Sequence, residues 1–373
     1  MSLFLGLMSG TSLDGIDGVA VSWPDDDAPE LQVLAHVHQG FDAALRAELL
    51  ALNAPGPDEL ERAARAGIAL AHAYASVVRA VLEQSGAARS QVRAVGAHGQ
   101  TVRHQPEAPA GGYTIQLLNG AVLAELTGSD VVCDLRSRDV AAGGQGAPLV
   151  PAFHADAFGA RGEARAVLNV GGIANLTLLH PDGRVGGFDC GPGNVLLDVW
   201  AARHRGVAYD DGGRWAASGK VDGALLQQLL AEPYLQRVPP KSTGRDLFDA
   251  AWLDAQLARC GRSLAAADVQ ATLAELSARA AADALQRHLH EARRLIVCGG
   301  GAFNGHLMAR LSALLPKLQV QASDLHGLPP QQVESVAFAW LAREFTLRRP
   351  GNRPDVTGAS GPRILGCLYP AGT

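Results

Sequence analysis

Three short turns rich in glycine or hydroxyl residues follow predicted strands in this chain, and turns of this kind can bind phosphate. They lie at Gly10, Gly171 and Gly299. Successive backbone N–H groups in such turns bind phosphate oxygens without a basic side chain. One turn alone is most often only a turn, but three at the ends of strands favour a nucleotide site. The chain contains no GxxxxGK[ST] sequence, which excludes a P-loop.

The first two turns each connect the strands of a predicted hairpin. Residues 3–8 and 16–22 flank the first turn, and residues 166–170 and 175–179 flank the second. The two turns are 171 − 10 = 161 residues apart, about one domain length. This spacing indicates a duplication with one strand–turn–strand loop in each half. The third turn opens a helix, which suits the nucleoside and α-phosphate.

Helices alternate with strands along the rest of the chain, which predicts an α/β protein with largely parallel sheets and ligands at the carboxyl ends of strands. Residues 141–148 (AAGGQGAP) have no periodicity and are the predicted linker. We predict helices at residues 59–83 with Gly86 as the C-cap, 120–126, 194–204 with Asn194 as the N-cap, 270–290 and 333–345, and strands at residues 92–96, 131–134, 186–189 and 294–298.

The composition favours a small-molecule partner in the cytoplasm. With 373 residues, 47% hydrophobic and 18% charged, the chain can fill the cores of two domains. Its net charge of −5 provides no basic field for nucleic acid or an anionic membrane. Five dispersed cysteines form no CxxC pair, so we expect reduced core thiols. Neither a signal peptide nor an apolar run of roughly 20 residues occurs, which predicts a soluble cytoplasmic protein.

Seven segments carry a resemblance to one enzyme family. They are GLMSGTSLDGID (6–17), GAHGQTVRH (96–104), RSRDVAAGGQGAPLVPAFH (136–154), NVGGIANLT (169–177), FDCGPGN (188–194), PPKSTGRDLF (239–248) and CGGGAFNGHLM (298–308). In this order they resemble the motif set of anhydro-N-acetylmuramic acid kinases. The resemblance covers nearly the whole chain, and the complete set is far more specific than any single loop.

The resemblance implies two actin-like (ribonuclease H-like) α/β domains around a central cleft for nucleotide and substrate. We expect an N-terminal domain at residues 1–138, to which residues 350–373 are a candidate addition, and a C-terminal domain at residues 139–349. The tips of the first two turns would then face the β- and γ-phosphates across the cleft. Closure of the domains on the substrate is a further hypothesis, because it would exclude bulk water and limit wasteful ATP hydrolysis.

The resemblance also implies the reaction. ATP phosphorylates O6 of 1,6-anhydro-N-acetylmuramic acid while water opens the anhydro bridge, a step of cell-wall recycling. Because phosphorus takes the leaving oxygen in place of a proton, one water-activating carboxylate suffices. The candidate base is Asp189, at a predicted strand end before the GPGN turn. A helix-capping role is the alternative for this residue.

Site residues are carried over from the family motifs to the matching positions. An arginine suits the lactyl carboxylate of the sugar, although Arg136 and Arg138 could equally be surface charges, and Glu334 could be a solvated helix residue. The predicted ATP contacts are Gly10, Thr11, Ser12, Leu13, Asp14, Gly15, Ile16, Asp17, Asn169, Gly171, Gly172, Gly299, Gly300, Gly301 and Asn304, and the predicted sugar contacts are Gln100, Thr101, Arg138 and Glu334.

Mg²⁺ is expected as a cofactor because γ-phosphoryl transfer develops charge that the ion stabilises. Many relatives in the wider superfamily carry a metal-anchoring Asp where this chain has Met8. The candidate metal ligands are therefore Asp14, Asp17 and Asp189, with no choice among them.

Two rival functions and one assembly remain open. The phosphate turns would equally serve a kinase of another sugar or small acid. An ATP-driven chaperone-like protein is disfavoured, because such proteins usually carry an appended substrate-binding module for which the chain leaves no room. A homodimer is compatible with the sequence, and the Ala-rich helix at residues 270–290 is a candidate contact.

Overall fold

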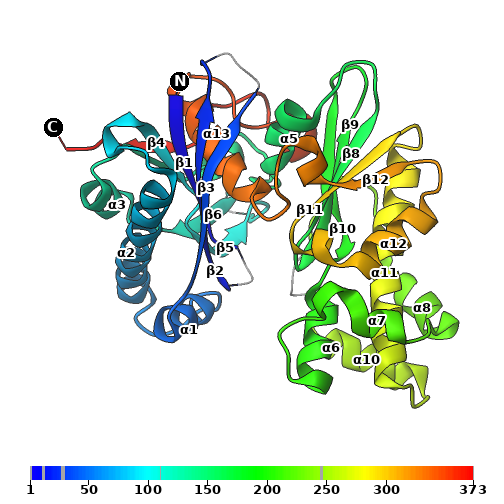
Figure 1. Ribbon diagram of the computed structural model, residues 1–373. Helices are drawn as coiled ribbons and strands as arrows, with labels where there is room; N and C mark the ends of the chain where they lie inside the picture. Colours follow the sequence, from blue (N-terminus) through cyan, green and yellow to red (C-terminus); the bar gives the residue numbers. More distant parts are fainter. Residues whose placement is uncertain (1, 11–12, 27–29, 110, 244–246, 373) are drawn as a thin grey trace. The chain divides into compact units, whose positions relative to one another are not determined.

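The computed structural model describes residues 2–10, 13–26, 30–109, 111–243 and 247–372, and the chain forms two compact units (Figure 1). The first unit comprises Met1–Ala157 and Gln332–Thr373, and the second comprises Phe158–Gln331. Residues 139–157 and 332–349, expected in the second domain, thus belong to the first. They do so because their side chains pack there: the buried Phe153 ring lies 6.1 Å from the Trp340 ring.

The first unit is built on a six-stranded sheet in the order β13-β7-β4-β1-β2-β3. β1 pairs with β2 antiparallel and with β4 parallel, which confirms the first predicted hairpin. A separate antiparallel pair, β5 and β6, was not predicted. The strands are β1 (Ser2–Met8), β2 (Gly15–Trp23), β3 (Gln32–Gly40), β4 (Val92–Ala97), β5 (Gln100–Gln105), β6 (Tyr113–Leu117), β7 (Val131–Cys133) and β13 (Cys367–Tyr369).

Two long helices, α2 (Glu59–Ser85) and α13 (Val333–Thr346), cover opposite faces of this sheet (Figure 1). An added Cβ on Gly6 would lie 2.0 Å from the carbonyl oxygen of Ser335 in α13. Gly18, which pairs with the next residue of β1, would place a Cβ 2.3 Å from Val77 in α2. Since successive strand residues face opposite sides, the sheet lies between the helices. The other helical elements are α1 (Ala43–Ala51), η1 (Arg89–Gln91), α3 (Gly120–Thr127), α4 (Ser137–Ala141), α5 (Val150–Phe158) and α14 (Pro354–Thr357).

Helix α2 is long and apolar enough, by length and composition alone, to cross a membrane. Its apolar side is nevertheless used inside the unit. Leu70, Tyr74 and Val78 are almost completely buried in the core shared with β1 and β2. The polar side, which includes Arg65, is exposed. This is the pattern of a core helix at the surface of an α/β layer, and the predicted C-cap, Gly86, has the left-handed conformation.

The sheet of the second unit has the order β10-β9-β8-β11-β12, which repeats the order β3-β2-β1-β4-β7 of the first. In both sheets three antiparallel strands precede two parallel ones. The prediction of largely parallel sheets is therefore wrong. The first three strands of each unit are joined by connections without a crossover helix, and only antiparallel strands allow this. The strands are β8 (Arg165–Val170), β9 (Ile173–Leu179), β10 (Val185–Pro192), β11 (Arg294–Cys298) and β12 (Gln319–Ala322).

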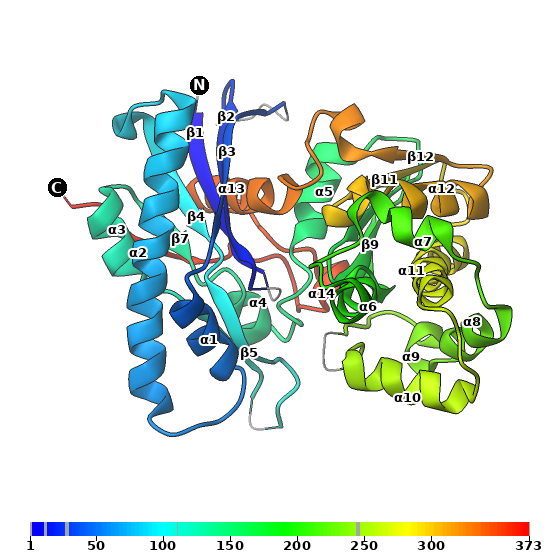
Figure 2. The same cartoon turned by 60° about the horizontal axis from the view of Figure 1, so that its bottom comes forward.

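The Ala-rich helix α11 (Ala266–His288) is buried inside the second unit (Figure 2). Its small residues, such as Ala278 and Ala282, pack on the sheet, while Leu273 and Leu276 face a second core made by the other helices. Packing within the unit thus accounts for this helix without a second subunit. The remaining helical elements are α6 (Val195–Arg205), η2 (Asp211–Gly213), α7 (Arg214–Ser218), α8 (Gly223–Leu230), α9 (Pro233–Gln236), α10 (Ala250–Cys260), η3 (Gly300–Phe303), α12 (Gly305–Leu314) and η4 (Ser323–His326).

All five cysteines were expected to be buried in the core, and this is true of three of them. Cys133, Cys190 and Cys298 are buried, Cys260 is half-buried and Cys367 is exposed. Cys367 lies on the edge strand β13, opposite Cys133, and the two sulfur atoms are 3.9 Å apart. Exposure follows from the position of β13 at the edge of the sheet, which leaves one side uncovered.

The close approach of α13 to the sheet predicts a large effect of a single methyl group. Gly96→Ala should lower the free energy of unfolding by about 1–3 kcal/mol, since the new Cβ would lie 2.0 Å from the carbonyl oxygen of Phe338. Gly223→Ala is the control, because a Cβ at that first residue of α8 has no neighbour within 4 Å. Urea unfolding of both variants tests this, and equal stability would contradict it.

Candidate active site

The turns at Gly171 and Gly299 lie side by side in the second unit. β8 ends at Val170 and β11 ends at Cys298, and the two strands are parallel neighbours with Cys298 opposite Asn169. The carboxyl ends of adjacent parallel strands meet at one edge of a sheet. Two of the three predicted phosphate turns therefore share that edge.

The Gly171–Gly172 turn is held through its carbonyl groups. The N–H of Asn194 donates to the Gly171 oxygen at 2.8 Å, and the N–H groups of Gly193 and Val195 donate to the Gly172 oxygen at 2.9 and 3.1 Å. A Cβ on Gly193 would lie 2.3 Å from the Gly171 oxygen, so only glycine permits this approach. Within the described part of the chain no acceptor takes the N–H of Gly171 or Gly172. These two donors are available to a phosphate.

The Gly299–Gly301 turn packs against the end of β8. Gly299 has a φ of 76°, and a Cβ there would lie 2.4 Å from Oδ1 of Asn169. A Cβ on Gly301 would lie 2.3 Å from Cγ1 of Val170. Asn169 itself is buried, and its Oδ1 has no hydrogen-bond partner among the described residues. A ligand donor at this turn would satisfy it.

Asn304, a predicted ATP contact, is the N-cap of α12. Its Oδ1 accepts a hydrogen bond from the N–H of Leu307 at 3.0 Å. A Cβ on Gly213 would lie 2.0 Å from that same oxygen. The close approach of η2 to this cap was missed by the sequence analysis, although the Gly212-Gly213 pair was a signal for it.

Asp189 lies in β10, directly before a bulge that shifts the pairing with β9. Its Oδ2 accepts a hydrogen bond from the N–H of Thr243 at 3.0 Å, and its Oδ1 has no partner in the described chain. The N-cap of the following helix α6 is Asn194, not Asp189. The alternative role of Asp189 as a helix cap is therefore excluded.

The surroundings of Asp189 tune its charge. Partial burial raises the pKa of this carboxyl to about 6, although the Thr243 N–H and the Lys241 ammonium lower it in part. The Lys241 Nζ lies 4.8 Å from the centre of the Tyr234 ring, and the Tyr234 hydroxyl donates to the Asp189 carbonyl oxygen at 2.8 Å. Lys241, Thr243 and Tyr234 were not predicted as site residues. The motif PPKSTGRDLF, which contains Lys241 and Thr243, and the rarity of lysine in this chain were signals for two of them.

In the first unit, the opening turn is held by its Gly10 carbonyl oxygen, which accepts from Nε2 of Gln100 at 3.1 Å and from the N–H of Leu13 at 3.2 Å. Asp14 is exposed, whereas Ile16 points into the core. Gly15 opens β2 and pairs with β3. Thr11 and Ser12 lie outside the described residues.

Asp17 is engaged by two histidines of the neighbouring strand. Its Oδ1 lies 3.0 Å from Nε2 of His36 and 3.1 Å from Nδ1 of His38. Both contacts use the same carboxylate oxygen, Oδ1. No cluster of three or more metal-ligating side chains occurs in the part of the chain that the structure describes.

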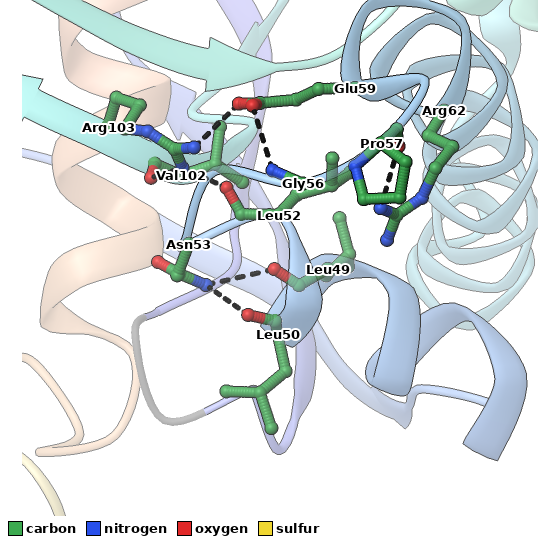
Figure 3. A network of polar contacts seen from close by, with 10 residues as sticks. All are labelled: Leu49, Leu50, Leu52, Asn53, Gly56, Pro57, Glu59, Arg62, Val102 and Arg103. Atoms are coloured by element: carbon green, nitrogen blue, oxygen red, sulfur yellow. Dashed lines mark hydrogen bonds and ion pairs between the residues drawn. The ribbon is translucent and has the colours of Figure 1, made fainter.

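The predicted sugar residues on β5 are positioned by a network at the start of α2 (Figure 3). Arg103 donates to Oε1 of Glu59 at 2.6 Å and also to the carbonyl oxygen of Leu52. Because Arg103 lies on the strand that begins with Gln100 and Thr101, these bonds tie β5 to the α1–α2 connection. Gln100 is fully buried, and Oγ1 of Thr101 accepts from Gln116 at 3.2 Å.

Arg136, rather than Arg138, turns inward. The Arg138 side chain is exposed. Arg136 donates through Nε and Nη2 to Nε2 of His98, at 3.1 and 3.0 Å, and through Nη1 to the carbonyl oxygen of Gly146 at 2.8 Å. Burial lowers its pKa to about 10, while the carboxylate of Glu334 raises it.

The glycine-rich residues 141–148 are not the linker, because the first unit continues to Ala157. Asp139 organises this loop: its Oδ2 accepts from the N–H of Gly146 at 2.8 Å, and its Oδ1 accepts from Asn352 at 2.6 Å and Thr357 at 2.8 Å. Asp139 is completely buried. A loop without periodicity is thus fixed by one carboxylate.

Comparison with known proteins connects this site to an enzyme family. The family profile described as "Anhydro-N-acetylmuramic acid kinase" matches residues 2–371. A protein of that name from Bordetella petrii is 60% identical over 371 residues, covering 99% of this chain and 96% of the relative. One from Albidiferax ferrireducens is 56% identical over 390 aligned positions, covering 99% of both. The chain belongs to the anhydro-N-acetylmuramic acid kinase family.

Membership in the anhydro-N-acetylmuramic acid kinase family makes the chain a carbohydrate kinase and confirms the predicted resemblance. The α/β fold with two related units agrees with the expected actin-like class. Among solved structures, component A of the Acidaminococcus fermentans (R)-2-hydroxyglutaryl-CoA dehydratase aligns with a TM-score of 0.50 over 92% of this chain and 98% of that one. At 12% identity this likeness concerns the fold alone.

The buried Asp139 generates a prediction about stability. Asp139→Ala should lower the free energy of unfolding by about 2–4 kcal/mol, because it leaves the donors of Gly146, Asn352 and Thr357 unsatisfied. Asp182→Ala, which removes only a surface pair with Arg184, should cost less than about 1 kcal/mol. Guanidinium unfolding separates the two, and similar losses would show that Asp139 does not organise the loop.

Proposed function

We propose that this protein phosphorylates O6 of 1,6-anhydro-N-acetylmuramic acid with ATP while water opens the anhydro bridge, giving N-acetylmuramic acid 6-phosphate and ADP for cell-wall recycling in the cytoplasm. One observation carries the proposal: in the second unit, a carboxyl with a pKa near neutrality stands in the strand before the turn that clamps Gly171–Gly172. Membership in the family supplies the substrate class.

Asp189 acts as the base in this proposal. A water oxygen forms a bond to C1 of the sugar, its proton passes to the free Oδ1 of Asp189, and the C1–O6 bond breaks. O6 takes the γ-phosphoryl group, and ADP leaves with the electrons of the broken phosphoanhydride bond. A carboxyl with a pKa of about 6 is ionised at neutral pH and still basic enough to assist this transfer.

The phosphates of ATP are proposed to bind the free N–H groups of Gly171 and Gly172, since amides at a strand end need no basic side chain. Mg²⁺, when bound, would neutralise the charge that develops on the phosphoryl oxygens. Asp189 is assigned to the base, so the hard oxygen donors proposed for such an ion are the carboxylates of Asp14 and Asp17 on the first unit. One carboxylate oxygen of Asp17, Oδ1, already contacts His36 and His38.

We assign the lactyl carboxylate of the sugar to Arg136 in place of Arg138. Arg136 has five N–H donors, and three of them are used by His98 and Gly146, so two remain for a ligand. A planar guanidinium with two free donors matches a carboxylate. Gln100, Thr101 and Glu334 lie on the same unit and are proposed to bind hydroxyl and amide groups of the sugar.

Replacement of the proposed base should abolish turnover without unfolding the protein. Asp189→Asn keeps an acceptor for the Thr243 N–H but cannot take a proton, so kcat should fall at least ~10³-fold while ATP binding changes less than about threefold. Asp182→Asn on the surface is the control. Steady-state kinetics measures kcat, and calorimetric titration measures ATP binding. Wild-type turnover in Asp189→Asn would remove this residue from the mechanism.

The raised pKa of Asp189 predicts an acidic limb in the pH profile. Protonation below a pKa of about 6 removes the base, so kcat/KM for the sugar should fall about tenfold per pH unit below that value and level off above it. The kinetic profile is measured between about pH 4.5 and 8. A profile that stays nearly flat over this range, because its limb lies near the ordinary Asp pKa of about 4, would show that burial does not set the charge of Asp189.

The product distinguishes the proposed reaction from that of a plain sugar kinase. Purified protein is incubated with ATP, Mg²⁺ and 1,6-anhydro-N-acetylmuramic acid, and the product mass is measured. We expect the gain of one water and one phosphoryl group together. Gain of the phosphoryl group alone would favour a plain kinase, and no product would contradict kinase activity on this sugar.

A further inference from the structure

His98 links two parts of the first unit: the opening turn, which is predicted to contact ATP, and Arg136, which is assigned to the sugar carboxylate. It follows β4 and is buried, with an exposed fraction of 5%. One ring nitrogen, Nδ1, lies 3.1 Å from the carbonyl oxygen of Ser9, the residue before the opening turn. The other, Nε2, lies 3.1 Å from Nε and 3.0 Å from Nη2 of Arg136.

The partners of His98 determine its protonation. A carbonyl oxygen can only accept, so the Ser9 contact requires a proton on Nδ1. A guanidinium can only donate, so the Arg136 contacts require a lone pair on Nε2. His98 is therefore the neutral Nδ1–H tautomer. Its pKa of about 3, lowered by burial and then by the charge of Arg136, agrees with a ring that stays neutral.

Ser9 and Arg136, the two partners of His98, are each held by further buried contacts. At the turn, Oγ of Ser9 donates to the carbonyl oxygen of Gly99 at 3.0 Å and lies 2.9 Å from the Tyr74 hydroxyl. At the other end, Arg136 donates to Gly146 in the loop that Asp139 organises. The ring also packs on Phe338, with centroids 4.8 Å apart. Neither end can move without disturbing the ring, because cores are close-packed.

We propose that His98 is a positioning residue that, as the neutral Nδ1–H tautomer, joins the opening phosphate turn to the Arg136 guanidinium and couples nucleotide binding to sugar binding. The coupling rests on the proposed function, which assigns Arg136 to the sugar carboxylate, and on the predicted contact of Gly10 in the opening turn with ATP. Phosphate at the turn fixes the Ser9 carbonyl, the ring and the guanidinium in turn. The two free donors of Arg136 are then held ready for the carboxylate.

Two substitutions separate the two bonds. In His98→Asn the amide stands near the position of Nδ1 and can still donate to the Ser9 oxygen, but it does not reach Arg136. In His98→Gln the longer side chain offers an acceptor near the position of Nε2 and loses the bond to Ser9. His98→Leu removes both. A role in folding alone would impair the Asn and Gln variants in the same way, whereas the proposed role gives opposite patterns.

The kinetic expectation follows from these losses. For His98→Asn, KM for the sugar should rise at least roughly tenfold, with KM for ATP within about twofold of wild type. For His98→Gln, KM for ATP should rise instead. In wild type a non-hydrolysable ATP analogue should tighten sugar binding, and in His98→Leu this effect should disappear in calorimetric titrations. Equal changes in both KM values for the Asn and Gln variants, or coupling retained in His98→Leu, would overturn the proposal.

A spectroscopic measurement tests the tautomer independently of activity. In protein labelled with ¹⁵N-histidine, His98 should show a protonated Nδ1 and an unprotonated Nε2, and its signals are assigned by their loss in His98→Gln. A proton on Nε2 would refute the proposal even if the enzyme is active. If the wild-type protein phosphorylates no sugar, the proposed function fails, while the tautomer result still stands.

Discussion

The structure depends on close contacts between backbone segments at positions where glycine has no side chain. In the first unit, Gly6 and Gly96 bring α13 so close to the sheet that a methyl group would lie 2.0 Å from a helix carbonyl oxygen. In the second unit, Gly193, Gly299 and Gly301 do the same for the turns around β8. No side chain fits into these contacts. The excess of glycine in the sequence, 43 residues, is therefore explained in part by packing and in part by the phosphate turns.

Buried polar groups divide into two kinds in this protein. Asp139 is surrounded by donors, and Arg136 has an acceptor for three of its N–H groups, so these charges stabilise the loops around them. Asp189 receives only the N–H of Thr243 and keeps one free oxygen, and its pKa is raised. Incomplete satisfaction of this half-buried carboxyl lowers stability, and it fits the proposed role of Asp189 as a base.

Local signals predicted much of the fold from the sequence. Helical periodicity predicted α2 and α13, two short apolar segments on either side of a hydroxyl-rich turn predicted the first hairpin, and β11 was predicted at its observed bounds. The strands β5 and β6 were missed because their residues, including Arg103 and Gln116, are polar and only half-buried. Short polar strands of this kind carry little apolar alternation.

Tertiary contacts limited what could be predicted about the site. The strand that carries Asp189 was predicted, but it continues to Pro192 beyond the predicted end at residue 189, past a bulge that the local sequence does not reveal. Arg136 is the N-cap of the five-residue helix α4 and contacts His98, whereas Arg138 lies inside the helix, and a helix this short has no periodicity that would predict the difference. Residues 141–148 looked like a linker because their order comes from Asp139, Asn352 and Thr357, which are far apart in sequence.

The first unit is assembled from both ends of the chain, whereas Phe158–Gln331 is one continuous stretch. During synthesis the sheet of β1, β2 and β4 is complete long before α13 exists, and its face at Gly6 and Gly96 stays without its covering helix until residues 333–346 have emerged from the ribosome. The later half can meanwhile collapse as an autonomous body. The first unit can therefore be completed only after the whole second unit has been synthesised, and a chain that ended before residue 333 would leave this face of the sheet uncovered.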